Sequence, residues 1–458
     1  MWNCDGESSP RAGLHVDNHL RTAFRYRRRM VPNSQETQSA YCRLYTRETG
    51  SPCSIPSVDA FNVDEPIAGT PPTFISPIYT NLFANTPRDI MTYAEKPFYQ
   101  DAPAFPFRTQ ILKYLQEYGE DIRDLVRFNV EVVRVEKERE SWCLSVRDLR
   151  DSSRKSWVEK FDAVAVASGK HIYLHGKRLI TGHYDVPLIP DVPGIETFPA
   201  TKISHAKYFR HPSAYKDKNV LLVGNGPSGA DLANQLLHHA TSVQRSVRSE
   251  ANALAITNPK VRDIQPIKCF RPDSIELLDG TILSNIDKVI FCTGYLYSLP
   301  MFPKDTGFIT PDGLYVHHLY DQTFYSEDPS LVFLGLPKQV IPFPTFQNQA
   351  IVVCKIWAQR LALPSREVMR KDEAARLQEM NFDGSKYHSF KFPEDVALAE
   401  HWREWAERDK GEGSERGMRP WRWTQERVEF RRGAPRVKVR FLEETEKGMW
   451  DYLLLHEA

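Results

Sequence analysis

The chain has 458 residues, 41% of them hydrophobic, and its 60 basic and 59 acidic side chains give a formal net charge of +1. At roughly 150 residues per domain, this length predicts about two to three domains with packed cores. The balanced charge gives no field that favours nucleic acid, no apolar run reaches the roughly 18 residues that span a bilayer, and the N-terminus lacks the apolar core of a secretory signal, so we expect a cytoplasmic protein.

Residues 1–76 are rich in Ser, Pro, Thr and Arg without a sustained period, which predicts mostly loop. Further along, apolar spacing predicts helices at residues 107–122 and 346–362 and in the charged segment from about residue 365, whose tryptophans we expect to pack on a helical surface. Strands are predicted at residues 130–137, 141–149, 160–169, 242–247 and 329–337, with a hairpin turning at Asp279-Gly280 and a further strand at residues 274–295.

Seven cysteines without a CxxC pair indicate scattered reduced thiols. The adjacent histidine pairs His238-His239 and His317-His318 have no further ligand at a suitable spacing. We therefore predict no metal site.

The stretch "NVLLVGNGPSGADLANQL", Asn219 to Leu236, has the strand–loop–helix order of a dinucleotide fingerprint. In such a loop Gly224 makes the tight turn, Gly226 lets the backbone approach a pyrophosphate, and Gly229 lets the helix pack on the strand. The N-terminus of the helix adds N–H donors and a positive potential. The alternative is a tight glycine turn in an ordinary parallel sheet.

The nicotinamide nucleotide can be predicted from the next strand, "VQRSVRS". An NAD site places a carboxylate about twenty residues after the loop, whereas this chain has Arg245, Ser246 and Arg248 there, with no acid between them and Glu250. Guanidinium groups suit a phosphate, so NADP(H) is the expected ligand. The alternative is that these arginines are solvated charges at a strand end.

The segments "ETFPATKISHAKYFRHP", before the glycine loop, and "FCTGY", after it, resemble motifs of flavin-containing monooxygenases. In "ETFPATKISHAKYFRHP", Phe198, His205 and Phe209 match anchors of the family's FxGxxxHxxx(Y/F) pattern, with Ala200 at the glycine and one extra residue before the histidine. "FCTGY", from Phe291, is similar to the family's FATGY, and "LFANTPRDIMTY" resembles its TNxPKxLMxF segment. The similarity covers roughly residues 77 to 410, in order.

The resemblance implies an α/β fold with two Rossmann-like dinucleotide-binding domains, the NADPH domain being inserted into a discontinuous FAD domain. The expected boundaries are 1–195 for the first part of the FAD domain, 196–286 for the NADP(H) domain, and 287–458 for the return of the FAD domain with a C-terminal helical segment. The family's first βαβ unit, which holds the FAD pyrophosphate, is missing from this sequence. We therefore expect the chain as written to be poorly soluble or flavin-free.

The segment "KHIYLHGKRLITG", Lys170 to Gly182, interrupts a stretch that the family reads continuously as ATG-H-Y-x-x-P. Joining Ala167-Ser168-Gly169 directly to His183 would restore that reading. The segment is interpreted as an insertion, either a surface excursion or a retained intron translated in frame.

The resemblance also implies a function: an NADPH- and FAD-dependent monooxygenase that inserts one oxygen of O₂ into a soft N or S centre of a small molecule through a flavin C4a-hydroperoxide. It places the active-site asparagine at Asn85, for which an Asx-turn cap before Pro87 is the alternative, and it gives His205 an orienting role. The implied cofactor contacts are Trp2, Asn85, Thr86, Val132, Ser168, Gly169, His205, Gly224, Gly226, Ser228, Gly229, Ala230, Asp231, Ser246, Arg248, Thr293, Gly294 and Gln349.

Two other functions remain open. One is a Baeyer–Villiger monooxygenase that oxidises ketones, and the other is a flavin-free, NADP-binding remnant without turnover. The substrate cannot be read from the sequence, because variable loops line such pockets. A homo-oligomer is possible.

Overall fold

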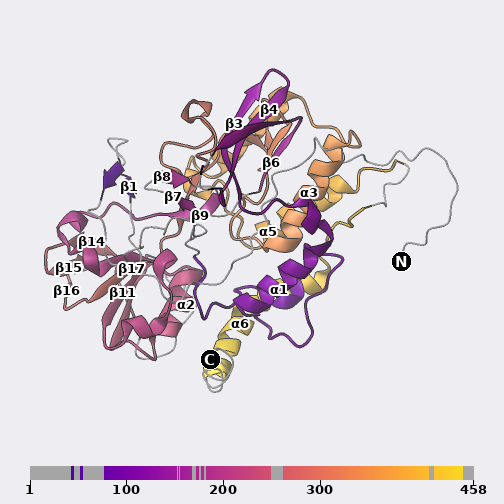
Figure 1. Cartoon of the computed structure of the whole chain (residues 1–458). Helices are drawn as coiled ribbons and strands as arrows, with labels where there is room; N and C mark the ends of the chain where they lie inside the picture. The colour runs from indigo at the N-terminus through magenta and orange to yellow at the C-terminus, as the bar shows by residue number, and fades with distance from the viewer. Residues whose placement is uncertain are drawn as a thin grey trace.

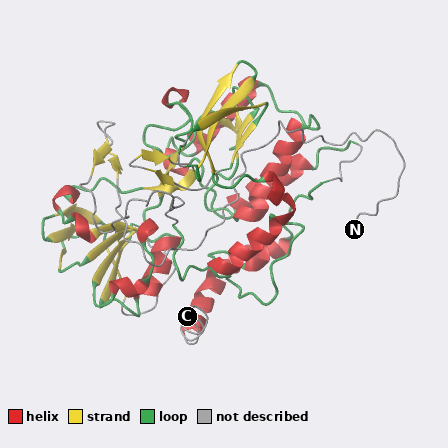
Figure 2. Ribbon diagram, viewed as in Figure 1, coloured by secondary structure: helices red, strands yellow, loops and turns green. Residues whose placement is uncertain are grey.

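The structure is a computed structural model that describes residues 43–45, 52–54, 77–151, 153, 155–167, 172–174, 177–179, 182–248, 261–411 and 417–446. Strands and helices alternate through it (Figure 2), which confirms the expected α/β class. A parallel sheet lies at one side of the molecule (Figure 1). At the other side are the longer helices, α1 (Arg108–Tyr118), α3 (Pro342–Trp357), α5 (Glu394–Ala406) and α6 (Gln425–Glu446).

The parallel sheet carries the glycine fingerprint. Its five strands lie in the order β10 (Ile203–His205), β17 (Lys288–Phe291), β11 (Asn219–Val223), β12 (Ser242–Ser246) and β13 (Val261–Ile264). Successive side chains of a strand point to opposite faces. Thus Val220 and Leu222 pack with helix α2 (Pro227–Leu236) on one face, whereas Leu221 joins a second buried cluster on the other. Both faces of β11 are therefore buried, which fits its continuous apolar run.

The predicted hairpin is confirmed in a small antiparallel sheet of β14 (Ile267–Phe270), β15 (Ser274–Leu277) and β16 (Ile282–Ser284). At its turn Gly280 has φ +83°, a left-handed conformation that favours glycine. The Thr281 amide donates to the Asp279 carboxylate at 3.0 Å.

One expected boundary needs a correction. The sequence interpretation ended the nucleotide-binding segment at residue 286, yet β17 begins at Lys288 and pairs in parallel with both β10 and β11. The segment must therefore extend through Phe291. The boundary was misplaced because β17 precedes a family motif, whereas only strand pairing shows which sheet it completes.

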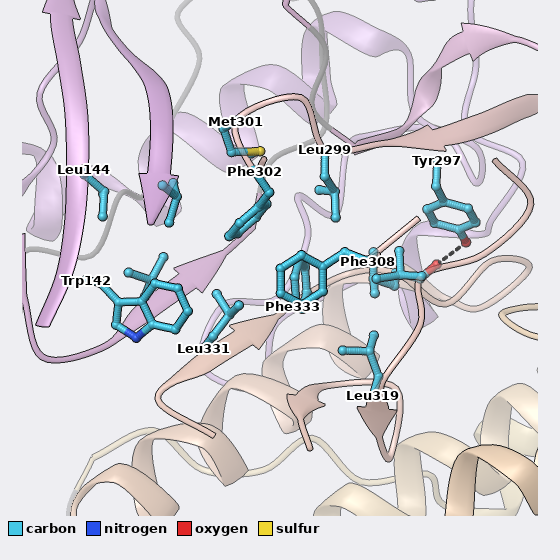
Figure 3. Packing of buried hydrophobic residues seen from close by; sticks show 14 of the residues in the cluster. Trp142, Leu144, Tyr297, Leu299, Met301, Phe302, Phe308, Leu319, Leu331 and Phe333 are labelled. Carbon is cyan, nitrogen blue, oxygen red and sulfur yellow. Dashed lines mark hydrogen bonds between the residues drawn. The ribbon is translucent and has the colours of Figure 1, made fainter. Parts of the chain in front are cut away.

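A second core lies between two further sheets (Figure 3). One contains β3 (Val130–Glu138), β4 (Ser141–Asp148) and β5 (Ser156–Phe161), and the other has the order β19 (Leu319–Tyr320), β20 (Phe324–Tyr325), β21 (Leu331–Phe333) and β6 (Val164–Val166). Trp142, Phe308 and Phe333 meet in this core, and the Tyr297 hydroxyl donates to the Leu336 carbonyl at 2.8 Å. The parallel pair β6–β21 joins chain from before and after the nucleotide-binding sheet.

Helices cover the face of the β19–β20–β21–β6 sheet that lies opposite the second core. Ala165 and Val332 of the sheet pack against α3 and α5, where Trp402 and Trp405 lie in the same buried cluster. Trp402 is 1% exposed and Trp421 is 2% exposed. The tryptophans of the C-terminal segment therefore pack inside the fold, as expected. The charged helix α4 (Arg366–Glu379) precedes α5, and none of the helices in the described part of the chain is both long and apolar enough to cross a bilayer.

The remaining strands are short. Within residues 1–76, which the sequence predicts as mostly loop, the structure describes an antiparallel pair, β1 (Arg43–Tyr45) and β2 (Pro52–Ser54). Within the expected insertion, β7 (Ile172–Leu174) and β8 (Lys177–Leu179) form an antiparallel hairpin. The next strand, β9 (Gly182–Pro187), pairs with β18 (Tyr295–Ser298).

This pairing sharpens the prediction for the insertion. Deleting Lys170 to Gly182 removes the self-paired hairpin and a single residue at the edge of β9. We expect the melting temperature to stay within about 2 °C of wild type or to rise, because β7 and β8 pair with each other and both leave together. Thermal unfolding monitored by circular dichroism measures this, and a fall of about 8 °C or more would show that the segment packs into the core.

Candidate functional site

The loop between β11 and α2 has the backbone geometry that a nucleotide pyrophosphate requires. Gly224 has φ +108°, and a Cβ there would lie 3.0 Å from the Cys292 carbonyl oxygen. A Cβ on Gly229 would lie only 2.2 Å from the carbonyl oxygen of Gly224. Both positions therefore exclude a side chain, one at the turn and one where the helix crosses the loop.

Gly226 differs from these two glycines because the space beside it is open. A Cβ at Gly226 would meet no protein atom within 4 Å. Directly after it α2 begins with Pro227, so the first-turn N–H groups of Ser228 and Gly229 lie at the N-terminus of a helix. The Ser228 hydroxyl is exposed. An open glycine surface beside a helix N-terminus fits a pyrophosphate group.

The end of β12 provides a partial match to a 2′-phosphate site. Arg248 is exposed, and its guanidinium has no partner among the described residues. Ser246 is 5% exposed and donates weakly to the Gln265 carbonyl at 3.3 Å. Arg248 is therefore the side chain here that has a free charge for a phosphate.

Arg245 was expected to contribute to this phosphate site, and that expectation is wrong. Its side chain is 1% exposed, and Nε and Nη2 donate to the two carboxylate oxygens of Asp263, each at 2.7 Å. Asp263 is its register partner on the neighbouring strand β13. The Arg245 guanidinium therefore pairs with a carboxylate on the neighbouring strand. The residue pattern of β12 alone could not have indicated this ion pair.

Replacing Arg248 with alanine is expected to weaken NADPH binding about tenfold to a hundredfold, the value of a charged hydrogen bond to phosphate. NADH binding should not change, because NADH lacks the phosphate. Titration of both nucleotides against wild type and Arg248→Ala measures the ratio. Equal NADPH affinity in the two proteins would remove Arg248 from the site.

His205 is a fully buried histidine at the end of β10. The Lys207 backbone N–H donates to Nδ1 at 3.1 Å, so the proton must lie on Nε2, which donates to the Gly294 carbonyl at 3.0 Å. Burial lowers the pKa of this imidazole to about 3, so the ring is neutral at physiological pH. His205 thus ties β10 to the FCTGY turn, in agreement with an orienting role.

The FCTGY turn is itself tied to the chain before the nucleotide-binding sheet. Thr293 Oγ1 donates to the Leu188 carbonyl, and the Leu188 N–H donates to the Gly294 carbonyl at 2.9 Å. Gly294 has φ +86°, with open space where a Cβ would stand. Thr293 and Gly294 therefore lie in the connection between β17 and β18.

Asn85 lies in an exposed bend just before the short 3₁₀ helix at Arg88–Ile90. Its amide forms no hydrogen bond with a described residue, and no side chain caps that helix, so the Asx-turn alternative finds no support here. The adjacent Thr86 is half-buried. The amide of Asn85 is free to bind a ligand.

The segment before Asn85 is held against the nucleotide-binding helix by a buried polar cluster. The Tyr79 hydroxyl donates to the Asp231 carboxylate, and Gln235 Nε2 donates both to Asp231 Oδ2 and to the Asn81 carbonyl, each at 3.0 Å. Burial raises the pKa of Asp231 above its usual range. Asp231 was expected to contact cofactor. Its position on the buried face of α2 corrects this, because the carboxylate binds Tyr79.

Lys438 of α6 holds the same segment from the other side. It is 4% exposed, and its Nζ donates to the carbonyl of Ala84, the residue before Asn85, at 2.9 Å. The ammonium also lies 4.6 Å from the centre of the Phe105 ring and 5.4 Å from that of Phe83, within cation–π range. Burial lowers the pKa of Lys438 to about 8, while the charge of Asp231 opposes that shift. Sequence reasoning missed this lysine, since 354 residues separate it from Ala84.

Only some of the residues expected at the flavin lie in the described part of the chain. Trp2, Ser168 and Gly169 lie outside the described residues. Gln349 is 1% exposed, with Oε1 accepting from the Gly335 N–H at 3.0 Å and Nε2 donating to Thr323 Oγ1 at 2.7 Å. Its amide is therefore engaged within the fold, and the expected contact of Gln349 with cofactor stays a prediction. Val132 is half-buried against the second core.

Among the described residues, no group of three or more His, Cys, Asp or Glu side chains could hold a metal ion. The two histidine pairs do not form such a group: His317 instead approaches Glu373, with Nδ1 3.2 Å from the carboxylate.

Comparison with protein families and curated proteins agrees with this geometry. The family model for FMO-like proteins, described as flavin-binding monooxygenase-like, matches residues 73–263. The chain is 27% identical to flavin-containing monooxygenase ustF2 of Aspergillus flavus, covering 76% of this chain and 77% of the relative. It is 30% identical to flavin-containing monooxygenase FMO GS-OX-like 2 of Arabidopsis thaliana, covering 71% and 70%. It is also 30% identical to the thiol-specific monooxygenase of Saccharomyces cerevisiae, covering 62% of this chain and 66% of that protein.

Solved structures share the fold. S-allyl-L-cysteine S-oxygenase from Allium sativum superposes with a TM-score of 0.62 at 24% identity, covering 81% of this chain and 85% of that chain. Tmm from Pelagibacter sp. strain HTCC7211 gives a TM-score of 0.60 at 24% identity, covering 73% and 72%. The fold class with two Rossmann-like dinucleotide-binding domains is thereby confirmed.

Proposed function

Because this chain belongs to the flavin-containing monooxygenase family, whose cofactors are FAD and NADPH, we propose that it transfers one oxygen atom of O₂ to a soft nitrogen or sulfur centre of a small molecule. The observation that carries the proposal is the Gly224–Gly229 loop. Gly224 and Gly229 leave no room for a side chain, and Gly226 borders open space at the N-terminus of α2. This arrangement suits NADPH, which supplies the hydride for the reaction.

The roles of the chain's own residues follow from this geometry. The Gly226 backbone and the first turn of α2 would bind the pyrophosphate, and Arg248 would bind the 2′-phosphate. Asn85 would place its free amide against the reacting groups. His205 stays neutral and donates to the Gly294 carbonyl in the connection between β17 and β18, so it takes no proton from substrate.

We also propose the discontinuous domain arrangement. The pairing of β6 with β21 supports it, because those strands lie on either side of the nucleotide-binding sheet in the sequence yet share one sheet. For the flavin, the described residues provide no second loop with three glycines, so they do not by themselves form a cradle for its pyrophosphate. We therefore assign no step to individual flavin contacts.

Sulfur is the favoured reacting centre. Two of the similar proteins are named for sulfur substrates, a thiol-specific monooxygenase and an S-allyl-L-cysteine S-oxygenase. We propose a thioether or thiol as the substrate class, with tertiary amines as the class to compare.

The test is to purify the chain, measure bound flavin by absorbance, and follow NADPH oxidation together with sulfoxide or N-oxide formation. If the proposal holds for the chain as written, the protein is yellow, consumes NADPH and yields sulfoxide from a thioether, contrary to the flavin-free chain that the missing βαβ unit predicts. A protein that binds NADPH but carries no flavin and forms no product would instead support the non-catalytic NADP-binding alternative. Lactone formation from a cyclic ketone would support the Baeyer–Villiger alternative.

A further inference from the structure

A pocket that shares no lining residue with the glycine loop lies between two segments that are far apart in the sequence. Its cavity volume is about 590 Å³, within the range of small-molecule sites. One wall is the segment from Thr92 to Pro97, and the other is the segment from Arg419 to Arg422 together with Arg427 of the first turns of α6. Nothing in the proposed oxygenation uses this cavity.

The lining is unusually rich in positive charge. Three of the lining side chains are arginines, Arg419, Arg422 and Arg427, and one is a carboxylate, Glu95. Both oxygens of that carboxylate are already engaged, Oε1 by the Arg419 backbone N–H and Oε2 by Gln347 Nε2, each at 2.7 Å. Glu95 still offsets one positive charge, but neither of these bonds involves a guanidinium, so the arginine side chains keep their donors.

The three guanidinium groups differ in the partners that they already have within the fold. Arg422 donates to Glu407 at 3.0 Å, so a carboxylate outside the pocket already neutralises it. Arg427 donates to the Arg422 carbonyl at 2.8 Å, and its guanidinium lies 4.4 Å from the centre of the Trp421 ring, contacts that orient it without neutralising it. The Arg419 guanidinium has no partner among the described residues. Two guanidinium groups thus remain for a ligand, and with Glu95 they leave a net positive charge.

The floor of the pocket is held by hydrogen bonds of Trp421. Trp421 is 2% exposed, and its indole N–H donates to Thr92 Oγ1 at 3.2 Å. Its backbone N–H donates to Asn348 Oδ1 at 2.7 Å, and Asn348 Nδ2 donates to its carbonyl at 2.8 Å. The two walls are therefore fixed to each other and to α3, so little ordering is needed when a ligand binds.

We propose that this pocket is a binding site for a small organic anion that carries a carboxylate or a phosphate. Arg419 and Arg427 bind the oxyanion, because guanidinium forks match the oxygen pairs of both groups. Thr92, Ala94, Pro97 and Pro420 surround the organic part. The site goes beyond the oxygenation and does not depend on it.

The experiment is a calorimetric titration of the purified chain with three probes of similar size: phenyl phosphate, benzoate and uncharged benzyl alcohol. Each titration is repeated with saturating NADP⁺, which fills the Gly224–Gly229 loop. We expect binding of at least one anion, unchanged by NADP⁺, and no binding of benzyl alcohol. The tighter anion identifies the preferred oxyanion.

Arg419→Gln is the test variant, since its guanidinium forms no hydrogen bond or ion pair with a described residue and its loss should leave the melting temperature unchanged. We expect anion affinity to fall about tenfold to a hundredfold. Arg436→Gln is the matched control, because Arg436 is also exposed, lies on α6 and loses the same charge. Its affinity should stay within about twofold of wild type.

Three results would overturn the proposal. They are equal affinity in wild type and Arg419→Gln, binding of benzyl alcohol as tight as that of the anions, and displacement of the probe by NADP⁺. Failure to detect binding of either anion up to about 10 mM, weaker than about 3 kcal/mol, would also overturn it. None of these measurements requires turnover, so they are independent of the oxygenase activity.

Discussion

Gly226→Ala is expected to fold like the wild type and to lose about a hundredfold or more in NADP(H) affinity. Its Cβ would meet no protein atom within 4 Å, and Gly226 has φ −67°, which alanine adopts without strain. The added methyl group would instead occupy the open space that we assign to the pyrophosphate. Nucleotide titration measures the affinity, and thermal unfolding checks the fold.

The matched variant is Gly229→Ala, three residues along the same loop. Its Cβ would lie 2.2 Å from the Gly224 carbonyl oxygen, so the helix or the loop must move. We expect a loss of about 3 kcal/mol in the free energy of unfolding, as for an overpacked core. If Gly226→Ala binds NADPH as tightly as wild type, the loop does not hold the pyrophosphate. If both variants unfold, the space beside Gly226 has been misassigned.

Asn85→Leu is expected to lower the rate of oxygenated product formation about 100-fold to 1,000-fold, the usual cost of removing one positioned polar group. NADPH affinity and melting temperature should stay unchanged, because the amide is exposed and bonds to no described residue. The measurement is the ratio of sulfoxide formed to NADPH consumed, together with the two controls. If product formation matches that of wild type, the role carried over to Asn85 is wrong.

A second readout separates a chemical role from a structural one. The bend at Asn85 is anchored through the Ala84 carbonyl by Lys438, which the variant leaves in place. Amide hydrogen exchange over residues 83–88 should therefore be the same in Asn85→Leu and wild type. Faster exchange in the variant would attribute any loss of activity to a disordered bend.

Much of the fold and the nucleotide loop could be predicted because the signals are local. The turn at Gly224, the open surface at Gly226 and the helix contact at Gly229 all depend on residues that are adjacent in the chain. The hairpin at Asp279-Gly280 follows from the same kind of short-range turn chemistry. Order along the sequence was enough for these features.

The sequence could not show which arginine side chain of the site is available for a phosphate. Arg245 and Arg248 look equivalent in "VQRSVRS", yet Arg245 is buried against Asp263, whereas Arg248 is exposed and has no partner among the described residues. The difference arises from the register of β12 with β13, which places Asp263 opposite Arg245. Strand register depends on how the whole sheet packs, so a single strand does not specify it.

What the sequence by itself determined was the family, the α/β class and the geometry of a glycine loop. Ordered motifs indicated the family and, with apolar periodicity, the class, and short-range backbone sterics set the loop. Tertiary structure alone decided which strand closes the nucleotide-binding sheet, which arginine is free, and what holds the Asn85 bend. Those outcomes rest on contacts such as β17 with β10 and β11 and Lys438 with Ala84, which join distant segments. Burial of apolar surface brings such segments together, and it is roughly proportional to area and non-directional, so no local pattern encodes which distant partners meet.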